Sequence, residues 1–560
     1  MGVIQYMSFK PRNFREWCNH TIPVLPQVYG DELSYYELLN KVIEKSNELG
    51  DTINELIEYV NHYFDSLDIQ KMIDKKLDEM AQDGTLADLI NNVIFSKLNK
   101  SVNKRAVKCV TVLEMVNDMD ISLNDIVITS GYYTVNDNGN ATYLILDVNS
   151  GYNIPLLNGL FAYFVGDSGR PEQFGCKGND SDDTTGLKNL LNTCKCVSFT
   201  PNKKYGFSSP LTVMGDTIIN GNFSCLHSLI IDVSSDPNDG LIKVSGDNCV
   251  FNNVKFDGGM NNAGQKVNKH TYDRPSSNGR PIIDTISGNK YNNILIENCI
   301  FENATAMSIQ LNDCDNVTVS NCKIRNSNRD AIFVIGDAIS IVGNIIEDCE
   351  DNYIAIDTNF INRDISGIVI SQNTLKKSMT NTDRYTISSS IGIFVGNSGG
   401  RTITKCNINN NMIESNYIAV KIDNVKECKL NSNDIRCGGL GKTTNTDLYG
   451  LYIKKSPNAY VTDNHIICDS HTLYIANECD GIVVQFCEIV NEDGSSPNMI
   501  KSYSNDVLIR YSYLQGVFNQ TVFDTTNLRL FMCAASGKEF TKTASTNIVK
   551  TILNYGDFIN

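Results

Sequence analysis

Three stretches of this chain follow one pattern: NVTVSNCKI at residues 316–324, AISIVGNII at 338–346 and GIVISQNTL at 367–375. Within each stretch, apolar residues alternate with other residues, which is typical of a short β-strand with one buried side. A small residue, Cys or Asn, then stands two positions before a large apolar residue. The return of this unit at intervals of commonly 22 to 25 residues indicates a repeat array.

The small residue and the large apolar residue two positions after it recur together from about residue 195 to about residue 530. The large apolar residue stands at Phe301, Ile324, Ile346, Leu375, Ile413, Ile435, Ile466, Ile489 and Leu514. The small polar residue before it is Cys299, Cys322, Asn344, Asn373, Asn411, Asn433, Asn464, Cys487 or Ser512. The longer intervals carry extra loops.

A leucine-rich repeat has a similar length, but these units lack its leucine spacing and contain short β-rich runs. Three strands and three turns fit each unit better, so we predict a mainly β fold, a right-handed parallel β-helix. Successive coils would stack about 4.8 Å apart, with equivalent residues above one another. Stacked Asn amides would then hydrogen-bond along the axis, which favours a structural role over metal or redox chemistry.

Composition excludes several classes of partner. The 560 residues carry a net charge of -16 and the sequence pI is about 4.9, so we expect neither nucleic acid nor an anionic membrane surface as a partner. No apolar run approaches the roughly 18 residues that span a bilayer. The 18 cysteines are scattered singly, which favours reduced, buried thiols. Cys194 and Cys196 lack partners at zinc spacing, so we expect no metal and no cofactor.

The first 105 residues predict a helical region. Apolar residues recur at alternating spacings of three and four, interrupted once by Ser46: Leu39, Val42, Leu49, Ile53, Leu56, Val60, Tyr63 and Leu67. Asp31 or Ser34 can cap the start of this helix. The pattern fits either one amphipathic helix on a globular core or a parallel coiled coil that oligomerises the chain, and we favour the coiled coil.

In residues 106–170 the spacing of apolar residues changes from the helical pattern to the alternation of β-strands. DIVITSGYYTVNDNGNATYLIL alternates around the turn signal NDNGN and predicts a hairpin in a small β-containing domain. After about residue 530 the repeat is no longer recognisable. We expect residues 531–560 to cap the open end of the helix, which residues 171–530 would form.

The stretch FGCKGNDSDDTTGL, residues 174–187, places Asp180, Asp182 and Asp183 in four residues. It could be a carboxylate active site or a structural joint. Leu187, Leu190 and Leu191 share one helical face just beyond it, so Asp182 or Asp183 stands at the expected N-cap. We therefore favour the joint.

This stretch also carries a family resemblance. With VSFTPNKKYGFSSPL it resembles the FGAKGDGVTDDTxAI and FPPGxYxISxPL opening of the pectate-lyase-like β-helix of bacteriophage tailspikes, with Cys176 in place of Ala and Asn179 in place of Asp. Residues 110–146 are similar to the small domain before that helix, and YGDELSYYELLNKVIEKSNEL and LDEMAQDGTLADLI are similar to virion-proximal segments, including those of pre-neck appendages.

The resemblance implies a homotrimer, made in the host cytoplasm and carried on the virion. Its N-terminal region would bind phage tail or neck proteins, and its helix would bind host surface glycan. The family includes lyases, hydrolases, esterases and receptor binders without catalysis. Cleavage of capsular polysaccharide or wall teichoic acid, binding alone, and a structural spacer therefore all stay open.

One strand of each coil can also be aligned: SIQL, AIFV, AIDT, GIFV, AVKI, GLYI, TLYI and MIKS. Its third residue should point to solvent. The predicted outward column is Gln310, Phe333, Asp357, Phe394, Lys421, Tyr452, Tyr474 and Lys501. Aromatic rings along a wall suit stacking on sugars, with charges to hold hydroxyls or anions, although they could instead pack on a covering loop or a neighbouring subunit.

Catalysis would need two carboxylates beside the bond. We predict Asp357, raised in pKa by apolar neighbours, and Asp330 on the adjacent coil as this pair. Phe333, Phe394, Lys421, Tyr452 and Tyr474 are the predicted substrate-binding residues. For β-elimination on a uronic acid, Lys421 could act as base or electrophile.

The remaining acids and two insertions complete the set of candidates. Asp351 and Asp423 are expected to be capping or solvated acids. An insertion at 258–281 holds His270, Asp273 and Arg280, which is either an anion site or a solvated loop, and the loop at 376–390 holds Arg384, which could bind an anion.

Overall fold

The computed structural model describes Glu55, Glu58 and residues 106–149, 151–230, 240–259, 279–286, 288–358, 361–376, 391–396, 401–415, 417–438, 448–491, 498–504, 506–516, 521–525, 527–536, 540–542 and 547–553. The chain divides into two compact units, Met1–Asn103 and Lys104–Asn560. The coiled-coil seam predicted over residues 39–67 and the attachment region lie outside the described residues.

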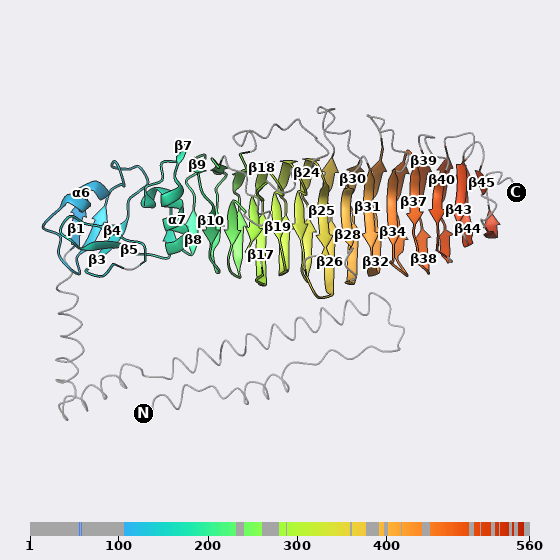
Figure 1. Ribbon diagram of the computed structural model, residues 1–560, viewed down its shortest axis with the longest axis horizontal. Coiled ribbons are helices and arrows are strands. Elements are labelled where there is room, and N and C mark those ends of the chain that lie inside the picture. Colours follow the sequence, from blue (N-terminus) through green and yellow to red (C-terminus); the bar gives the residue numbers. More distant parts are fainter. Residues whose placement is uncertain are drawn as a thin grey trace, which may run out of the picture. The chain divides into compact units, whose positions relative to one another are not determined.

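The second unit begins with a five-stranded sheet in the order β1-β2-β3-β5-β4 (Figure 1). Its elements are β1 Ala106–Cys109, α6 Val112–Asn117, β2 Ile126–Thr129, β3 Thr142–Leu146, β4 Ile154–Pro155 and β5 Phe161–Phe164. Strands β2 and β3 are antiparallel, as the alternating pattern predicts, and the loop between them places Asn136 and Asn138 at positive φ. Met115, Tyr143 and Ile145 are fully buried in its core.

A joint follows, formed by β6 Ser168–Gly169, the 3-10 helix η2 Pro171–Phe174, β7 Asn179–Asp182 and α7 Thr184–Thr193. Asp183 is buried and accepts hydrogen bonds from the backbone N–H groups of Lys177 (2.7 Å) and Gly178 (3.0 Å). Asp182 accepts from the N–H of Thr184 at 3.0 Å, the first residue of α7. These carboxylates satisfy backbone donors, so they act structurally, and Asp182 rather than Asp183 binds the N-terminus of the helix.

Beyond α7 the chain forms coils of three parallel strands, which give the β-helix three faces (Figure 1). The first face holds β10 Leu211–Val213, β13 Ile242–Val244, β16 Ile283–Thr285, β19 Ile309–Leu311, β22 Ile332–Val334, β25 Asn352–Asp357, β28 Ile391–Gly396, β31 Ile418–Asp423, β34 Tyr449–Lys454, β37 His471–Ile475, β40 Asn498–Ser502, β43 Thr521–Thr525 and β45 Phe540–Lys542. The parallel connections agree with a right-handed β-helix.

The second face follows the first in every coil. It holds β6, β8 Cys196–Ser198, β11 Ile218–Asn220, β14 Cys249–Asn252, β17 Tyr291–Glu297, β20 Cys314–Ser320, β23 Ile339–Val342, β26 Ile365–Ser371, β29 Ile403–Asn409, β32 Val425–Asn431, β35 Tyr460–Thr462, β38 Ile482–Gln485, β41 Val507–Arg510, β44 Asn527–Ser536 and β46 Asn547–Leu553.

The third face completes the coil. It holds β7, β9 Lys204–Phe207, β12 Cys225–Ser228, β15 Lys255–Asp257, β18 Ile300–Ala304, β21 Lys323–Ser327, β24 Ile345–Cys349, β27 Thr374–Lys376, β30 Met412–Ser415, β33 Asp434–Cys437, β36 His465–Cys468, β39 Glu488–Asn491 and β42 Tyr513–Gly516.

The predicted ladder is confirmed. Every marked apolar residue from Phe301 to Leu514 pairs in register with the next one, and all are fully buried. The side-chain amides of Asn344, Asn373, Asn411 and Asn433 each donate to the next Asn oxygen at 2.8–3.0 Å. Each Asn also satisfies buried backbone groups, so the ladder replaces water at the corner between the second and third faces.

Stacking continues past residue 530, where the sequence no longer shows the repeat. Strand β45 pairs in parallel with β43, and β46 pairs in parallel with β44 through Leu553. Two register shifts interrupt the β44–β46 pairing. Such irregularities obscure the spacing in the sequence although the coils remain.

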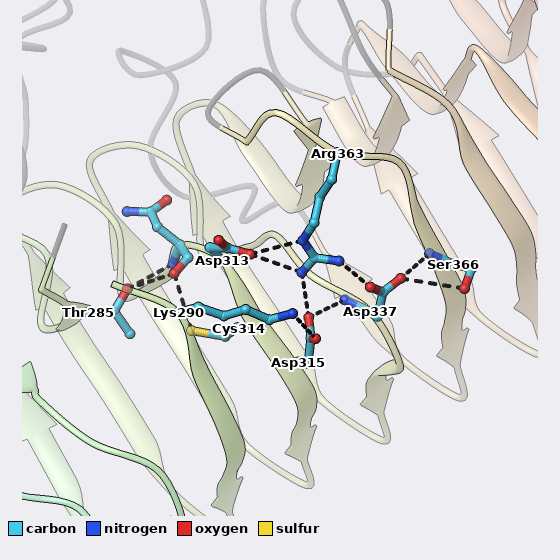
Figure 2. Close-up of polar contacts among 9 residues, drawn as sticks. Thr285, Lys290, Asp313, Cys314, Asp315, Asp337, Arg363 and Ser366 are labelled. Atoms are coloured by element: carbon cyan, nitrogen blue, oxygen red, sulfur yellow. Dashed lines mark hydrogen bonds and ion pairs between the residues drawn. The ribbon is translucent and has the colours of Figure 1, made fainter. Parts of the chain in front are cut away.

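A clamp of charged residues ties coils together at the corner between the first and second faces (Figure 2). The Arg363 guanidinium donates to Asp313 at 2.9 Å, to Asp315 at 2.5 Å and to Asp337. Lys290 contacts the second oxygen of Asp315 at 2.6 Å. Partial burial opposes ionisation of Asp315, but hydrogen bonds from the Asp337 N–H, Lys290 and Arg363 lower its pKa. Because every carboxylate has a cationic partner, we assign this cluster a structural role.

The other predictions about composition concern cysteines and membranes. None of the cysteines in the described part of the chain forms a disulfide; most are buried, while Cys196 is exposed and Cys225 is partly exposed. Within these described residues no helix is long and apolar enough to cross a membrane.

Candidate functional site

One outward column on the first face gathers aromatic and cationic side chains. Register pairs Phe394 with Lys421, Lys421 with Tyr452, Tyr452 with Tyr474, and Tyr474 with Lys501. All five side chains are partly exposed, whereas flanking residues such as Ile393 and Val395 are fully buried. The predicted alternation is therefore confirmed for this part of the column.

The prediction that Asp357 belongs to this column is wrong. Phe333 pairs with Ala355, and Ala355 pairs with Phe394, so Ala355 fills the expected place of the acid. Asp357 instead ends β25 and pairs with Gly396. It still faces outward, because a shift of two residues keeps a side chain on the same side of a strand.

Phe333 does not fit its predicted role as a substrate-binding residue. It is only 7% exposed and belongs to a small apolar cluster with Ala306, Met307, Ile335 and Ala355, packed against Ile361 and Phe394. Gln310, the preceding residue of the column, is also buried. The alternative left open by the sequence, packing under a covering segment, therefore holds at this end of the column.

Asp330 and Asp357, the predicted catalytic pair, do not lie next to each other. Asp330 is buried before β22 and accepts hydrogen bonds from the backbone N–H (3.0 Å) and side-chain amide (2.6 Å) of Asn352, the first residue of β25. Asp357 is the last residue of that strand, about 16 Å along it from Asn352 at about 3.3 Å per residue. Burial, and then the nearby Asp351 carboxylate, raise the pKa of Asp330 to about 7.

A second outward column brings a different pair of acids together. Asp357 pairs with Gly396, and Asp423 pairs with Lys454. A Cβ placed on Gly396 would lie 2.9 Å from the Cβ of Asp423, so these two residues are neighbours. Asp357 and Asp423 therefore lie two coils apart, about 10 Å at about 4.8 Å per coil, with Gly396 between them under the edge of the Phe394 ring. We call the two columns together the lysine–tyrosine face: Phe394, Lys421, Tyr452, Tyr474 and Lys501 with Asp357, Gly396, Asp423, Lys454 and Tyr503.

Cations and rings alternate on this face. The Lys421 Nζ lies 5.0 Å from the Phe394 ring centroid and 5.8 Å from that of Tyr452. Tyr452 and Tyr474 stack at 4.9 Å with planes 12° apart. The Lys501 Nζ lies 5.9 Å from Tyr474 and 5.6 Å from Tyr503. The ring faces therefore contact each other and the lysine amines, rather than standing open to stack on sugar as the sequence predicts.

Two groups on the lysine–tyrosine face are electrostatically unusual. Burial lowers the pKa of the Lys421 amine, while the carboxylates of Asp423 and Asp357 act in the opposite direction. Asp423 is 7% exposed; its Oδ2 lies 3.6 Å from Lys454, and its buried Oδ1 has no hydrogen-bond partner in the described part of the chain. A buried carboxylate oxygen without a donor is rare, and a ligand hydroxyl would reach it only when the side chains that cover it move.

The second acid could have been found in the sequence. Aligning the strands on their two inward apolar residues gives IAID (354–357), IFVG (393–396), VKID (420–423) and LYIK (451–454). This alignment puts Asp357, Gly396 and Asp423 in one column. The predicted capping or solvated role of Asp423 does not fit its burial.

Several other candidates can be placed only in part. His270, Asp273 and Arg384 lie outside the described residues, whereas Arg280 is described and its backbone N–H donates to Thr305 at 2.9 Å. Among the described residues no group of three or more His, Cys, Asp or Glu side chains could hold a metal ion.

No protein-family model matches the chain, and no curated protein matches it in sequence. Similar solved structures include the A-module of a mannuronan C-5 epimerase from Azotobacter vinelandii, at 12% identity and a TM-score of 0.41, covering 70% of this chain and 100% of that chain. Full-length tailspike protein 2 from a bacteriophage of Escherichia coli has 15% identity and a TM-score of 0.37, over 77% of this chain and 53% of that chain. An exopolygalacturonase from Thermotoga maritima has 11% identity and a TM-score of 0.35, over 69% and 91%. The β-helix assignment itself rests on the strand pairing within this chain.

Proposed function

We propose that this chain is a trimeric phage tailspike or appendage protein whose lysine–tyrosine face binds and cleaves host surface glycan. In this proposal the N-terminal region attaches to tail or neck proteins of the virion. The observation that carries the proposal is the pair of outward acids, Asp357 and Asp423, separated by Gly396 and bordered by Lys421 and Lys454.

The spacing supports hydrolysis. Inverting glycosidases hold their two carboxyl groups about 6.5–9.5 Å apart so that water fits on one side of the sugar. Asp357 and Asp423 project from strands about 10 Å apart, and small side-chain rotations bring their carboxyls into that range. Gly396 has no side chain, and the edge of the Phe394 ring lies over it, so substrate would enter between the acids when this ring rotates. In this arrangement one acid protonates the leaving oxygen and the other activates water.

The cations and phenols support binding. Lys421, Lys454 and Lys501 place positive charge on one face of a chain whose net charge is -16. The hydroxyls of Tyr452 and Tyr474 offer hydrogen bonds to sugar hydroxyls. If the substrate is a uronic acid, Lys421 is also suited to remove a proton in β-elimination, because its lowered pKa leaves more free amine.

The test uses purified full-length protein with a panel of host capsular polysaccharide and wall teichoic acid preparations. Wild type should release reducing ends, unsaturated sugars or phosphodiester products, and Asp357→Asn and Asp423→Asn should each lower the rate at least about 100-fold. Asp434→Asn, which changes an acid of the third face, is the matched control and should leave the rate unchanged. Unchanged cleavage by both face variants would refute the site. Retention of glycan without product would favour the alternative, a receptor-binding protein that does not cleave.

A further inference from the structure

The corner between the second and third faces changes character in the last coils. One residue per coil, directly before the ladder position, adopts a left-handed conformation with φ of 50–71°: Phe223, Asn253, Asn298, Asn321, Gly343, Gln372, Asn410, Ser432, Asp463, Phe486, Tyr511 and Met532. Gly, Asn and Asp adopt this conformation at least cost, and bulky residues rarely occupy it. The first position, Phe223, is large, apolar and 69% exposed, the next eight are polar or glycine, and the last three are again large and apolar, on successive coils.

These three residues, which we call the corner ridge, are all exposed. Phe486 is 52%, Tyr511 41% and Met532 47% exposed. The Phe486 and Tyr511 rings stack at 5.3 Å with planes 11° apart, so they form a continuous surface rather than scattered side chains. Both the backbone conformation and the exposure are unfavourable for an isolated chain. Such a patch is typical of a surface that another molecule covers.

The sides of the corner ridge carry opposite charges. On the second-face side, register pairs Gln485 with Arg510, and the Arg510 Nε donates to Gln485 Oε1 at 2.7 Å. On the third-face side stands Glu488, whose side chain is 47% exposed. In a closed ring of identical chains, one side of each copy meets the other side of the next copy. Arg510 of one copy would thus lie one coil, about 4.8 Å along the axis, from Glu488 of its neighbour.

We propose that the corner ridge is where copies of this chain pack together around an axis parallel to the β-helix. Identical coils then lie at the same height, so each ridge meets the equivalent ridges. This inference rests on the trimer proposed above and names the surface that closes it. The first face takes no part in this corner, so the lysine–tyrosine face stays open to glycan.

The ridge forms the centre of a larger interface. Each partner in a stable interface buries about 800 Å², which is more than three side chains supply. Val483 and Leu508, partly exposed neighbours on the second face, extend the apolar surface beside it. In earlier coils the equivalent residues are of both kinds: Asn407, Lys429, Ser340 and Thr318 are polar, whereas Ile218, Val250, Leu295 and Val369 are apolar. The C-terminal coils are therefore distinguished by three successive apolar residues at the corner, not by this column.

The first test is sedimentation of the full-length chain over a dilution series. A triple variant, Phe486→Asn, Tyr511→Asn and Met532→Asn, keeps residues that suit the left-handed corner, so it should fold with an undiminished Tm. We expect wild type to be a closed oligomer and the triple variant to dissociate at a concentration at least about 10-fold higher. Gln372→Asn, at the same corner outside the ridge, is the control and should behave like wild type.

The second test detects contact even if the N-terminal region also holds the chains together. Tyr511→Cys in a Cys196→Ser background should give disulfide-linked pairs of chains on mild oxidation, and Glu478→Cys, at an exposed position of the corner between the first and second faces, should not. A wild type that sediments as a single chain would overturn both the trimer and the ridge interface. An oligomer that the triple variant does not weaken and Tyr511→Cys does not link would overturn the ridge interface alone. Glycan cleavage, measured in parallel, should survive in the triple variant, so its loss in face variants is a separate result.

Discussion

The Asn373 side chain donates to the Asn411 oxygen at 3.0 Å, although 38 residues separate them in the sequence. The Asn373 backbone N–H donates to the same oxygen, also at 3.0 Å. The Asn411 side-chain amide in turn donates to the Asn433 side-chain oxygen and to the Ile370 carbonyl. One side chain thus joins its own coil to the coils on either side.

Asn411→Ala should therefore destabilise the β-helix. Four buried hydrogen bonds of roughly 1 kcal/mol each are lost, so we expect the free energy of unfolding to fall by about 2–4 kcal/mol. Chemical denaturation followed by circular dichroism measures the change. Lys429→Ala, an exposed position on the neighbouring coil, serves as control and should change stability by less than about 0.5 kcal/mol. Equal stability of Asn411→Ala and wild type would contradict the structural role of the ladder.

The charged clamp gives a prediction with a pH signature. Arg363→Met leaves Asp313, Asp315 and Asp337 without the guanidinium that all three contact. We expect a loss of about 2–3 kcal/mol at pH 7, because partly buried carboxylates then repel each other. The folded-state pKa of Asp315 lies below its unfolded value of about 3.9. Its contribution is therefore present above about pH 4 and is lost as pH falls through the lower, folded-state pKa.

The thermal stability of wild type and Arg363→Met should thus converge in acid. Arg436→Met is the control: Arg436 is 52% exposed and lies 3.7 Å from Asp434, a surface pair worth about 0–1 kcal/mol. A stability difference at pH 7 that persists unchanged at pH 3 would show that Arg363 contributes by packing rather than by charge.

The second and third faces could be predicted from sequence because the ladder residue marks each coil. Asn or Cys in a narrow buried corner, followed two residues later by Ile or Leu, fixes the register independently of loop length. The first face has no such mark. A one-residue error there would move every side chain to the wrong side, but a two-residue error preserves the alternation. An error of this second kind explains why the alignment of strands puts Asp357 beside Phe333.

The burial of side chains near the ends of strands also could not be predicted from the sequence. Asp330 and Phe333 are covered by turns and by residues such as Met307, whose positions depend on how connecting segments fold over the coil. Hydrophobic alternation describes the strand but not what lies above it. The burial of Asp423 escapes prediction for the same reason, since it arises from neighbouring coils.

Asp330→Asn should make the protein more stable in neutral and alkaline solution. The folded-state pKa of Asp330 is about 7 and its unfolded value is about 3.9, so the folded protein binds the extra proton between these values. Wild type therefore loses up to about 1.4 kcal/mol per pH unit from this group as pH rises from about 4 to 7. The amide oxygen of the variant side chain can still accept from Asn352, so the variant should lack this loss.

Unfolding measured in parallel from pH 5 to pH 9 tests this prediction. The two proteins should differ least at the acid end and most above about pH 7. Glycan cleavage by Asp330→Asn should match wild type, since Asp330 lies away from the lysine–tyrosine face. A large loss of cleavage with normal stability would instead return Asp330 to the catalytic pair.

The proposed glycan site predicts that Lys421 sets a preference for anionic polysaccharide. Its amine lies between the rings of Phe394 and Tyr452, where it is partly desolvated, so its charge is less screened than that of a surface lysine. We expect Lys421→Met to weaken binding of an acidic polysaccharide about 10-fold, a change of about 1.4 kcal/mol, and to reduce its salt dependence. Lys426→Met, an exposed lysine on the second face, should change neither. Because burial lowers the pKa of Lys421, wild-type binding should begin to fall at a lower pH than an ordinary lysine would give. Equal binding of acidic and neutral polysaccharides by wild type and Lys421→Met would show that Lys421 packs the aromatic column rather than reading charge.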